Sequence, residues 1–572
     1  TQMIASITAS MIGTRIGSAA RAPATMITKQ APASSQRMAF VRRPSLLIPC
    51  PDLSSVIRFT VPAAVEPLRS AGNRKGTDFT GPSSTRARQA KYMELSATWP
   101  YLIGLLDFVI AVTASAHAIL HKREVRAAIG WVGLIWLVPF GGGLLYLLLG
   151  VNRIRRKGAR IQDEITLLSE SRAAALPPPV HHLDHPDITR SIEGLVRAVG
   201  KVTRLPLLPG NRIEPLVCGD EAYPAMLEAI DQASSTVMMQ TYIFDVDRAG
   251  NEFIEALDRA HRRGVAVRVL VDGVGAAYSK PRAPHILRKR GIPVQEFLGQ
   301  FVPWRMPYMN LRNHRKILVV DGRIGFTGGL NIREGSIIGV PSAHPVQDLH
   351  FRLEGPVVRH LAEAFAKDWV FTCGEELFSP GWFPTLESHG QAVARGVSDG
   401  PDDEFERLHS TFLAALAGAD HSVRIMTPYF LPDQSLLSGL NTAALRGVRV
   451  DVLIPSRSNL RTVGWAMTSQ LDQVLDSGCR VWLTPPPFDH SKLMLVDGVW
   501  ALFGSGNWDP RSYRLNFEFN VESYDPKLGA RLERFVADRI DAARPVSVEE
   551  LHDRHLALKL RDGVAWLFSP YL

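Results

Sequence analysis

The feature that most constrains this chain is a motif that occurs twice with identical internal spacing. Each copy reads His-x-Lys, then Asp after four residues, then after six more residues Gly-Gly-x-Asn or Gly-Ser-x-Asn. Every matched position is displaced by the same number of residues, so the repeat predicts a duplicated fold whose halves each supply half of one site. The matched residues are His314, Lys316, Asp321 and Asn331 in the first copy and His490, Lys492, Asp497 and Asn507 in the second.

Each motif lies in a predicted β-hairpin. Apolar, β-rich runs over residues 316–320 and 492–496 end in Asp-Gly, which is a turn signal, and a second predicted strand follows each turn. Residues i and i+2 of a strand share a face, so the His and Lys of each copy point to the same side. The motif's two Asp residues fall at the turns, where we expect them to buttress the hairpins. Glycines after the second strands let the two Asn residues reach the same pocket.

Two His, two Lys and two Asn side chains around one pocket suit a phosphodiester. Lys and Asn stabilise charge on the non-bridging oxygens. One His can attack phosphorus while the other protonates the leaving oxygen. A single His-x-Lys is usually a solvated strand face, but two matched copies in a strand context favour the catalytic interpretation.

Two apolar runs predict a membrane anchor. Residues 101–120 are apolar except for Asp107 and His117, and residues 129–151 carry no charged side chain. At about 1.5 Å per residue each run is about 30 Å long, enough to cross a bilayer, and the short connector between them permits a helical hairpin. The alternative is a buried hairpin in a soluble core. The segment Pro139-Phe-Gly-Gly-Gly143 is expected to kink the second span.

Charge predicts an orientation and an anionic partner. Five basic residues follow the second apolar run, so the positive-inside rule places the large C-terminal part in the cytoplasm and the cluster among anionic headgroups. The net charge of +9 favours a phosphate-rich membrane surface or nucleic acid. The four cysteines are scattered and form no CxxC pair, a pattern that favours a reducing compartment. The basic cluster is Arg153, Arg155, Arg156, Lys157 and Arg160.

The segment before the first apolar run differs in composition from the rest. Residues 1–51 contain no acidic residue and are rich in Ser, Ala, Thr and Arg, which is typical of an organellar transit peptide. The alternative is a segment foreign to the protein, because Met93 reads as a natural start. We therefore interpret residues 1–92 as a disordered or non-native extension without a folded domain. Residues 93–160 are expected to form the transmembrane hairpin.

The rest of the chain predicts a linker followed by two α/β halves. A Pro- and His-rich composition indicates a linker over 161–204, after which strands alternate with amphipathic helices in two halves, 205–390 and 391–572. Helices are predicted over 222–233, 252–263, 405–419 and 435–446. Strands are predicted over 236–244, 265–271, 422–430 and 448–454.

The doubled motif resembles the HKD signature of the phospholipase D superfamily. Further segments resemble bacterial cardiolipin synthases, including Gln240-Thr-Tyr-Ile-Phe-Asp245, Leu311-Arg-Asn-His-Arg-Lys316 and Thr427-Pro-Tyr-Phe-Leu-Pro-Asp433. The resemblance runs from about residue 100 to the C-terminus. It implies a duplicated phospholipase D-like fold of two α/β/α sandwich halves, preceded by a two-helix transmembrane hairpin in the cell inner membrane.

The resemblance also implies an activity. It implies transfer of a phosphatidyl group from one phosphatidylglycerol to another with release of glycerol, through a phosphohistidine and without a metal or other cofactor. The expected partners are phosphatidylglycerol and anionic membrane lipid, and no nucleic acid is expected. The protein would be a multi-pass membrane protein with its catalytic part facing the cytoplasm.

The same resemblance implies further site residues. Family members carry a carboxylate that orients each catalytic His through its other ring nitrogen. We expect Asp348 to orient His314 and Glu518 to orient His490. The nucleophile usually lies in the first motif, which points to His314, although the near-symmetric motifs do not break the tie. The residues expected to bind substrate are Ser505, Tyr242 and Tyr429.

Two departures from the family pattern leave the acceptor open. Val346-Gln347-Asp348 stands where Trp-Arg-Asp is usual, and Ile332-Arg-Glu-Gly-Ser336 stands where an acidic-Tyr segment is common. Another alcohol, or water, therefore stays open as acceptor, which would make the protein a transphosphatidylase or a phospholipase D-type hydrolase. Nucleases rarely need two membrane spans, and a non-catalytic membrane scaffold has no need of two intact motifs.

Overall fold

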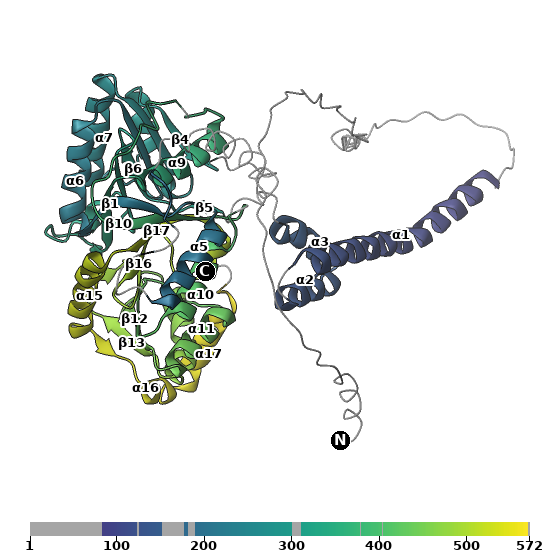
Figure 1. Ribbon diagram of the computed structural model, residues 1–572. Coiled ribbons are helices and arrows are strands. Elements are labelled where there is room, and N and C mark those ends of the chain that lie inside the picture. Colours follow the sequence, from purple (N-terminus) through teal and green to yellow (C-terminus); the bar gives the residue numbers. More distant parts are fainter. Residues whose placement is uncertain are drawn as a thin grey trace, which may run out of the picture. The chain divides into compact units, whose positions relative to one another are not determined.

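The structure is a computed structural model of the 572-residue chain (Figure 1). It describes residues 83–122, 125–151, 177–180, 183, 189–299, 311–377, 379–402 and 404–569, with side chains from residue 98 onward. Most of the predicted extension and the basic cluster after the second apolar run lie outside the described residues. Helix α1 (Ser83–His121) begins before the boundary that the sequence analysis sets at residue 93.

The two predicted halves share one β-sheet. Strands β1 (Leu208–Val217) and β10 (Ala392–Asp399) pair antiparallel at its centre. Outward from β1 follow β9 (Leu349–Glu354), β7 (Ile324–Gly328), β6 (Ile317–Val320), β2 (Thr236–Thr241), β3 (Ala266–Asp272) and β4 (Val294–Phe297). Outward from β10 follow β17 (Asn516–Tyr524), β16 (Trp500–Gly504), β15 (Leu493–Val496), β11 (Ser422–Met426), β12 (Arg449–Pro455), β13 (Arg480–Thr484) and β18 (Arg544–Pro545). The same strand order on both sides confirms the predicted duplication.

Helices cover both faces of this sheet (Figure 1). In the first half they are α6 (Cys218–Gln232), α7 (Arg248–Arg262), η4 (Gly275–Ala277), α8 (Ala283–Lys289), η6 (Glu334–Ser336) and α9 (Val358–Cys373). In the second half they are α10 (Arg407–Gly418), α11 (Gln434–Leu445), α12 (Arg461–Thr468), α13 (Leu471–Leu475), α14 (Pro510–Arg514), α15 (Pro526–Asp541), α16 (Val548–His552) and α17 (Leu556–Leu567). All eight predicted helices and strands are present, with ends shifted by a few residues.

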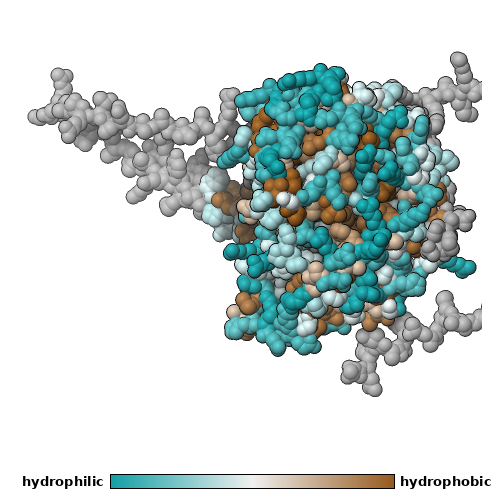
Figure 2. All heavy atoms as spheres, turned by 90° about the vertical axis from the view of Figure 1, so that its left-hand side faces the viewer, coloured by the Kyte–Doolittle hydropathy of each residue, from teal (hydrophilic) through white to brown (hydrophobic). Residues whose placement is uncertain are grey.

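A shared apolar core fixes the two halves relative to each other. Phe351 of β9 and Phe503 of β16 stack with ring centroids 3.7 Å apart, and both belong to one buried cluster that contains residues of both halves. Hydrophilic residues cover most of the face shown in Figure 2, with hydrophobic residues in small groups between them. The two motifs are therefore held in one rigid body rather than in two independent domains.

The predicted linker over 161–204 is partly wrong. Helix α5 (Arg190–Thr203) starts at Thr189, whose hydroxyl accepts a hydrogen bond from the amide of Ile192. Its buried face, with Leu195 and Val199, belongs to the same core cluster as α10. The amphipathic spacing of its apolar residues is the signal that the composition-based linker assignment missed.

One helix fits the predicted membrane anchor. Residues Thr98–His121 of α1 form a helix long and apolar enough to cross a bilayer. The second apolar run is not a single helix, since it breaks into α2 (Val125–Leu137), α3 (Gly141–Leu145) and the π-helical turn η2 (Tyr146–Gly150). Pro139, which lacks an N–H, lies within the break between Leu137 and Gly141. The predicted continuous span over 129–151, and with it the two-helix hairpin, is not confirmed.

Candidate active site

Short strands outside the main sheet bring each motif to the opposite half of the chain. Strand β5 (Arg312–Asn313) runs parallel to the start of β17, and the amide of His314 donates to the carbonyl of Phe517 at 2.9 Å. In the second half, β14 (Phe488–Asp489) runs parallel to β8 (Val346–Gln347), and the amide of His490 donates to the carbonyl of Gln347 at 2.7 Å. Each motif His therefore lies beside the segment that carries the other half's carboxylate.

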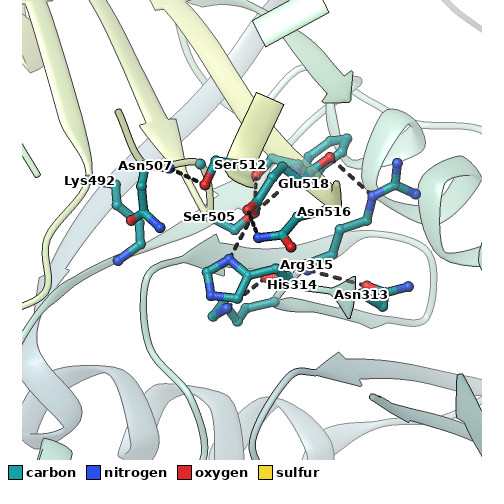
Figure 3. Close-up of polar contacts among 12 residues, drawn as sticks. Asn313, His314, Arg315, Lys492, Ser505, Asn507, Ser512, Asn516 and Glu518 are labelled. Carbon is teal, nitrogen blue, oxygen red and sulfur yellow. Dashed lines mark hydrogen bonds and ion pairs between the residues drawn. The ribbon is translucent and has the colours of Figure 1, made fainter. Parts of the chain in front are cut away.

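The carboxylates consequently orient the histidines in crossed pairs. His314 Nδ1 lies 2.9 Å from Glu518 Oε2 (Figure 3), and His490 Nδ1 lies 2.8 Å from Asp348 Oδ2. The expected pairing of Asp348 with His314 and of Glu518 with His490 is wrong, because the strand pairings just described cross between the halves. In both pairs the carboxylate holds Nδ1 and leaves Nε2 free for chemistry.

The two motif lysines lie in one electrostatic environment. Lys316 Nζ donates to the carbonyl of His314 at 2.6 Å, and Lys492 Nζ lies 3.0 Å from His490 Nδ1. Burial lowers the pKa of Lys316 to about 7, and the positive charge of Lys492 acts in the same direction. Burial likewise lowers the pKa of Lys492 to about 8. Near pH 7 Lys316 is therefore partly neutral while Lys492 is mostly charged, and an anion bound beside them would favour the charged form of both.

Both histidines respond to the lysines of both halves. Burial lowers the pKa of His314, with Lys316 and Lys492 adding to the effect and Glu518 opposing it. Burial lowers the pKa of His490 to about 4, and both lysines again contribute. Figure 3 shows Lys492 and Asn507 of the second half beside His314 of the first. The structure therefore brings the two motifs together, as the repeat predicts.

The motif Asn residues are buried next to these groups. Asn331 Oδ1 accepts a hydrogen bond from the amide of Ile243 at 3.1 Å, and the amide of Asn507 donates to Ser512 Oγ at 3.0 Å. Asn507 Oδ1 is buried and has no hydrogen-bond partner among the described residues. This unpartnered oxygen can accept a hydrogen bond from a donor group of a ligand.

Asp321 and Asp497 are the hairpin buttresses that their turn positions predict. The carboxylate of Asp321 accepts hydrogen bonds from three consecutive amides, residues 234–236, at 2.7 to 2.9 Å. That of Asp497 accepts from the amides of residues 420–422 at 2.7 to 2.9 Å. Each Asp thus ties its hairpin to the start of the neighbouring strand and makes no hydrogen bond to a motif His or Lys.

Ser505 is not placed to bind substrate, which corrects that prediction. Its buried hydroxyl donates to Glu518 Oε2 at 2.5 Å, and Asn516 Nδ2 donates to Glu518 Oε1 at 3.0 Å (Figure 3). The residue equivalent to Ser505 in the first motif is Gly329, where an added Cβ would lie 2.1 Å from Asp348 Oδ1. Glu518 therefore receives a hydroxyl hydrogen bond, whereas the carboxylate of Asp348 packs directly against Gly329 and accepts from the backbone amide of Leu349 at 2.8 Å.

Two tyrosines flank the histidines symmetrically. The ring of Tyr242 lies edge-on to His314 with centroids 5.2 Å apart, and the ring of Tyr429 lies edge-on to His490 at 6.3 Å. Thr241, directly before Tyr242, donates its hydroxyl to the carbonyl of Ile243, and Thr427, two residues before Tyr429, donates to the carbonyl of Tyr429. Burial raises the pKa of both phenols, so both stay neutral. Contact between substrate and these two tyrosines stays a prediction.

Arg315 is a site residue that the sequence analysis does not single out. It lies between His314 and Lys316 and points to the opposite side of the strand, where its guanidinium is fully buried. Its Nε donates to the carbonyl of Glu518 at 3.1 Å, and its other nitrogens lie 2.8 Å from Asp368 and 3.0 Å from Glu404. A basic residue on the inner face of a predicted core strand is the signal that indicates buried acidic partners.

Metal ligation finds no support in the described part of the chain. There, no group of three or more His, Cys, Asp and Glu side chains is placed to hold a metal ion. The expected absence of a cofactor stays a prediction.

Two His-Lys-Asn sets on a duplicated α/β sheet define a phospholipase D-like protein, and comparisons specify the family. A family model described as cardiolipin synthase, phospholipase D-like domain matches residues 226–369 and 412–539. A model described as phospholipase D-nuclease N-terminal matches residues 109–150. Cardiolipin synthase A of Pseudomonas entomophila (strain L48) is 33% identical over 476 residues, which are 82% of this chain and 98% of that protein. The chain belongs to the cardiolipin synthase family of the phospholipase D superfamily.

Two further comparisons agree with this assignment. Cardiolipin synthase A of Pseudomonas putida (strain GB-1) is 31% identical over 477 residues, again 82% of this chain and 98% of that protein. The crystal structure of phosphatidylserine synthase from Haemophilus influenzae Rd KW20 superposes with a TM-score of 0.51 at 17% identity. It covers 66% of this chain and 100% of its own, and it supports the fold alone.

Proposed function

We propose that this protein is a membrane phosphatidyltransferase that makes cardiolipin from two molecules of phosphatidylglycerol and releases glycerol. The observation that carries the proposal is the pair of complete His-Lys-Asn sets, each with its His oriented by a carboxylate of the other half. A helix long enough to span a bilayer supports a lipid substrate. The cardiolipin synthases that match the chain over most of its length support the choice of phosphatidylglycerol.

The pocket suits the phosphodiester of the donor lipid. Its negative charge between Lys316 and Lys492 raises the lysine pKa values from about 7 and about 8, so that both side chains become fully charged. Charged lysines and the side-chain N–H groups of Asn507 then stabilise the non-bridging oxygens as the phosphorus becomes five-coordinate. The same anion raises the pKa of His490 above its value of about 4, which lets this histidine carry a proton.

The reaction proceeds in two displacements. Nε2 of His314 attacks phosphorus, the bond to the donor's terminal glycerol breaks, and His490 gives its proton to the departing glycerol oxygen. The hydroxyl of a second phosphatidylglycerol then loses its proton to His490 and attacks the same phosphorus. The bond to His314 breaks, cardiolipin forms, and both histidines return to their starting states.

The assignment of His314 as nucleophile rests on the surroundings of Glu518. Burial alone would raise the pKa of Glu518, but His314, Lys316 and the hydroxyl of Ser505 hold it below its usual value. An anionic carboxylate on Nδ1 stabilises the ring when Nε2 carries the phosphatidyl group. Asp348 lacks the equivalent hydroxyl donor, because Gly329 stands in the position of Ser505.

One departure from the family pattern lies outside this machinery. The carboxamide nitrogen of Gln347 donates to the carbonyl of Pro487 at 3.4 Å, and its oxygen accepts from Arg539. The side chain therefore supports the crossed strands β8 and β14 rather than an acceptor. This departure therefore carries no argument against the family's usual alcohol acceptor.

The anchor and the charge pattern support a location. We place residues 98–150 in the cell inner membrane, with the catalytic part facing the cytoplasm, because basic residues follow the second apolar run. Anionic phosphatidylglycerol in that leaflet is then both the substrate and the surrounding surface.

A product assay tests the proposal. The purified full chain is supplied with vesicles of phosphatidylglycerol labelled in the terminal glycerol and in one acyl chain. A transferase yields cardiolipin and free glycerol in equal amounts. Phosphatidic acid with glycerol would instead identify a hydrolase, and transfer only to an added alcohol would identify a different acceptor.

A further inference from the structure

Helix α17 near the C-terminus has an inner face that packs on the protein. Asp562 is buried and pairs with Arg561 at 2.8 Å, and Ala565 is buried in the core of the second half. The guanidinium of Arg561 also lies 4.5 Å from the ring centroid of Trp465 in α12. The helix is thus fixed against α12 by its polar and small residues.

The outer face of α17 is apolar and exposed. Leu556, Leu560 and Leu567 are 66%, 61% and 68% exposed, and they recur at helical spacing along one stripe. Val564 and Phe568 lie beside them and are also exposed. We call these five residues the α17 stripe. A contiguous apolar patch of this kind on a folded protein marks an interaction site.

The α17 stripe is connected to the active site through α12. Tyr429 flanks His490, and its hydroxyl donates a hydrogen bond to Asn459 Oδ1 at 3.0 Å. The next residue, Leu460, is half-exposed, and α12 begins directly after it. The loop with Asn459 is therefore adjacent in the chain to α12, the helix on which α17 packs.

The charges around this surface favour an anionic occupant. Arg457 and Arg461 are exposed on either side of Leu460, and Lys559 is exposed on α17 itself. The acidic residue of α17, Asp562, is buried in its ion pairs with Arg554 and Arg561. Apolar residues flanked by basic ones are the composition of an amphipathic helix that lies in a bilayer surface.

From these contacts we propose that the α17 stripe, Leu460 and the basic residues around them bind the surface of an anionic membrane and hold the active-site loop at the headgroup layer. The stripe enters the interface between headgroups and acyl chains, while the arginines and the lysine contact phosphates. This contact is additional to the α1 anchor and does not depend on which reaction the site performs.

Fluorescence quenching tests the contact directly. The full chain carries an environment-sensitive fluorophore on Leu560→Cys, in a background with Cys50→Ser and Cys373→Ser, in vesicles whose lipids have brominated acyl chains. The matched control is Leu445→Cys, an apolar position on α11 that is 78% exposed. We expect quenching at residue 560 that is stronger with phosphatidylglycerol than with phosphatidylcholine alone, and none at residue 445.

Two results would overturn the proposal. Equal quenching at both positions would show that the stripe has no special contact with lipid. A fluorophore at residue 560 that is already shielded in lipid-free detergent, together with a dimer that Leu560→Glu dissociates, would show that a second copy of the chain covers the stripe.

Enzyme activity provides an independent test of the membrane contact. The double variant Leu556→Glu and Leu560→Glu should lower turnover of vesicle phosphatidylglycerol by about tenfold or more, because two leucines no longer enter the interface. Turnover of a short-chain phosphatidylglycerol dispersed in water should be kept, and Leu445→Glu should leave both activities unchanged. An equal loss on both substrates would indicate a damaged fold and would count against the proposal.

A separate observation concerns the second apolar run. Contacts along α1 show that α2 runs back toward its middle: Lys122 lies over the ring of Trp131 at 5.9 Å, and Trp136 donates to Ser115 at 3.1 Å. At the break after α2, the amide of Phe140 donates to the carboxylate of Asp107 at 2.7 Å. The chain then reverses.

The returning segment retraces the same path. Tyr146 of η2 makes a 2.7 Å hydrogen bond to His117 and packs on the ring of Trp131, with centroids 5.3 Å apart. The chain has thus come back to the end of α1 at which α2 began. The geometry points to a re-entrant pair, α2 with α3, that enters and leaves the bilayer on one side, so that only α1 crosses it.

This arrangement places the two ends of the anchor on opposite sides of the membrane. With the catalytic part in the cytoplasm, Ala97→Cys should react with a membrane-impermeant maleimide in intact cells that carry Cys50→Ser. The natural Cys373, exposed on the catalytic part, should react only after permeabilisation. Reaction of both cysteines only after permeabilisation would show two crossings and overturn the inference.

Discussion

Glu518, which follows the second motif in the chain, orients His314 of the first motif across the interface between the halves, with 2.9 Å between Oε2 and Nδ1. Asp348 orients His490 in the reciprocal way. Neither half therefore contains a complete His–carboxylate pair. The site is therefore complete only when the two halves are joined, as they are through the pairing of β1 with β10.

The crossed pairs predict which step each carboxylate supports. Glu518→Gln should impair attack on phosphorus by about 10²-fold or more, because His314 loses its oriented tautomer and its anionic partner. Asp348→Asn should impair protonation of the leaving group, so a donor with a good leaving group should restore its rate of phosphoenzyme formation. Single-turnover kinetics with phosphatidylglycerol and with the donor that has a good leaving group tests this. Rescue of Glu518→Gln by that donor, instead of Asp348→Asn, would show that Glu518 supports the acid and would contradict the assignment of His314 as nucleophile.

The nucleophile can be identified by trapping. Replacing either His should lower turnover by about 10³-fold or more, because nucleophile and acid work as a unit. His490→Ala given a donor with a good leaving group should still accumulate a phosphatidyl-enzyme, whereas His314→Asn should not. Mass spectrometry of the quenched protein locates the adduct. An adduct on His490 would reverse the two roles, and near-normal turnover in both single variants would exclude the mechanism.

The sequence predicts much of the site because its signals are local. The spacing of His and Lys on a strand, the turn positions of the two Asp residues and the alternation of helices and strands all follow from neighbouring residues. The crossed partners do not, since β5 pairs with β17 and β14 with β8 over long separations that no local pattern encodes. A choice between two carboxylates on near-identical halves needs the tertiary structure.

The other errors have physical reasons too. Ser505 reads as a polar residue beside the catalytic Asn, but its hydroxyl is buried behind Glu518. The second apolar run satisfies the length rule for a span, yet Pro139 and the following glycines break it into two short helices. Composition alone does not show where an apolar segment turns back.

The Ser505 hydroxyl gives a graded test of the support for Glu518. Ser505→Ala should destabilise the fold by about 1–2 kcal/mol and reduce turnover modestly, because one hydrogen bond to a buried carboxylate is lost. Ser505→Thr keeps the hydroxyl and is the matched variant. Where the added methyl group is accommodated, it should lose less activity than Ser505→Ala. Thermal unfolding and steady-state kinetics measure the two effects. Unchanged kinetics in Ser505→Ala would show that Glu518 needs no such support.

Arg315 is predicted to stabilise the junction of the two halves. Arg315→Met should lower the free energy of unfolding by about 3–5 kcal/mol, because Asp368 stays buried without its cation and Glu404 keeps only its pairs with Lys367 and Arg407. Arg212→Met, at an exposed pair with Glu214, is the matched control and should change stability by less than about 1 kcal/mol. Denaturant unfolding of the purified proteins compares them. Similar losses in both variants would contradict this role.

The lysine pKa values predict an alkaline limit for substrate capture. In the empty site the pKa of Lys316 is about 7 and that of Lys492 is about 8, so both side chains are charged below pH 7 and both lose their protons as the pH rises through 7 to 8. Because kcat/KM reports the free enzyme, it should fall across this window, while kcat, measured with the phosphodiester bound, should hold to higher pH. Lys492→Arg keeps its charge at all these pH values and should move the fall in kcat/KM toward the titration of Lys316 alone. Profiles of kcat and kcat/KM from pH 6 to pH 9.5 on vesicles of constant composition test this. A kcat/KM that stays flat to pH 9.5 in the unmodified enzyme would show that the lysines keep their ordinary pKa values and enter the reaction already charged.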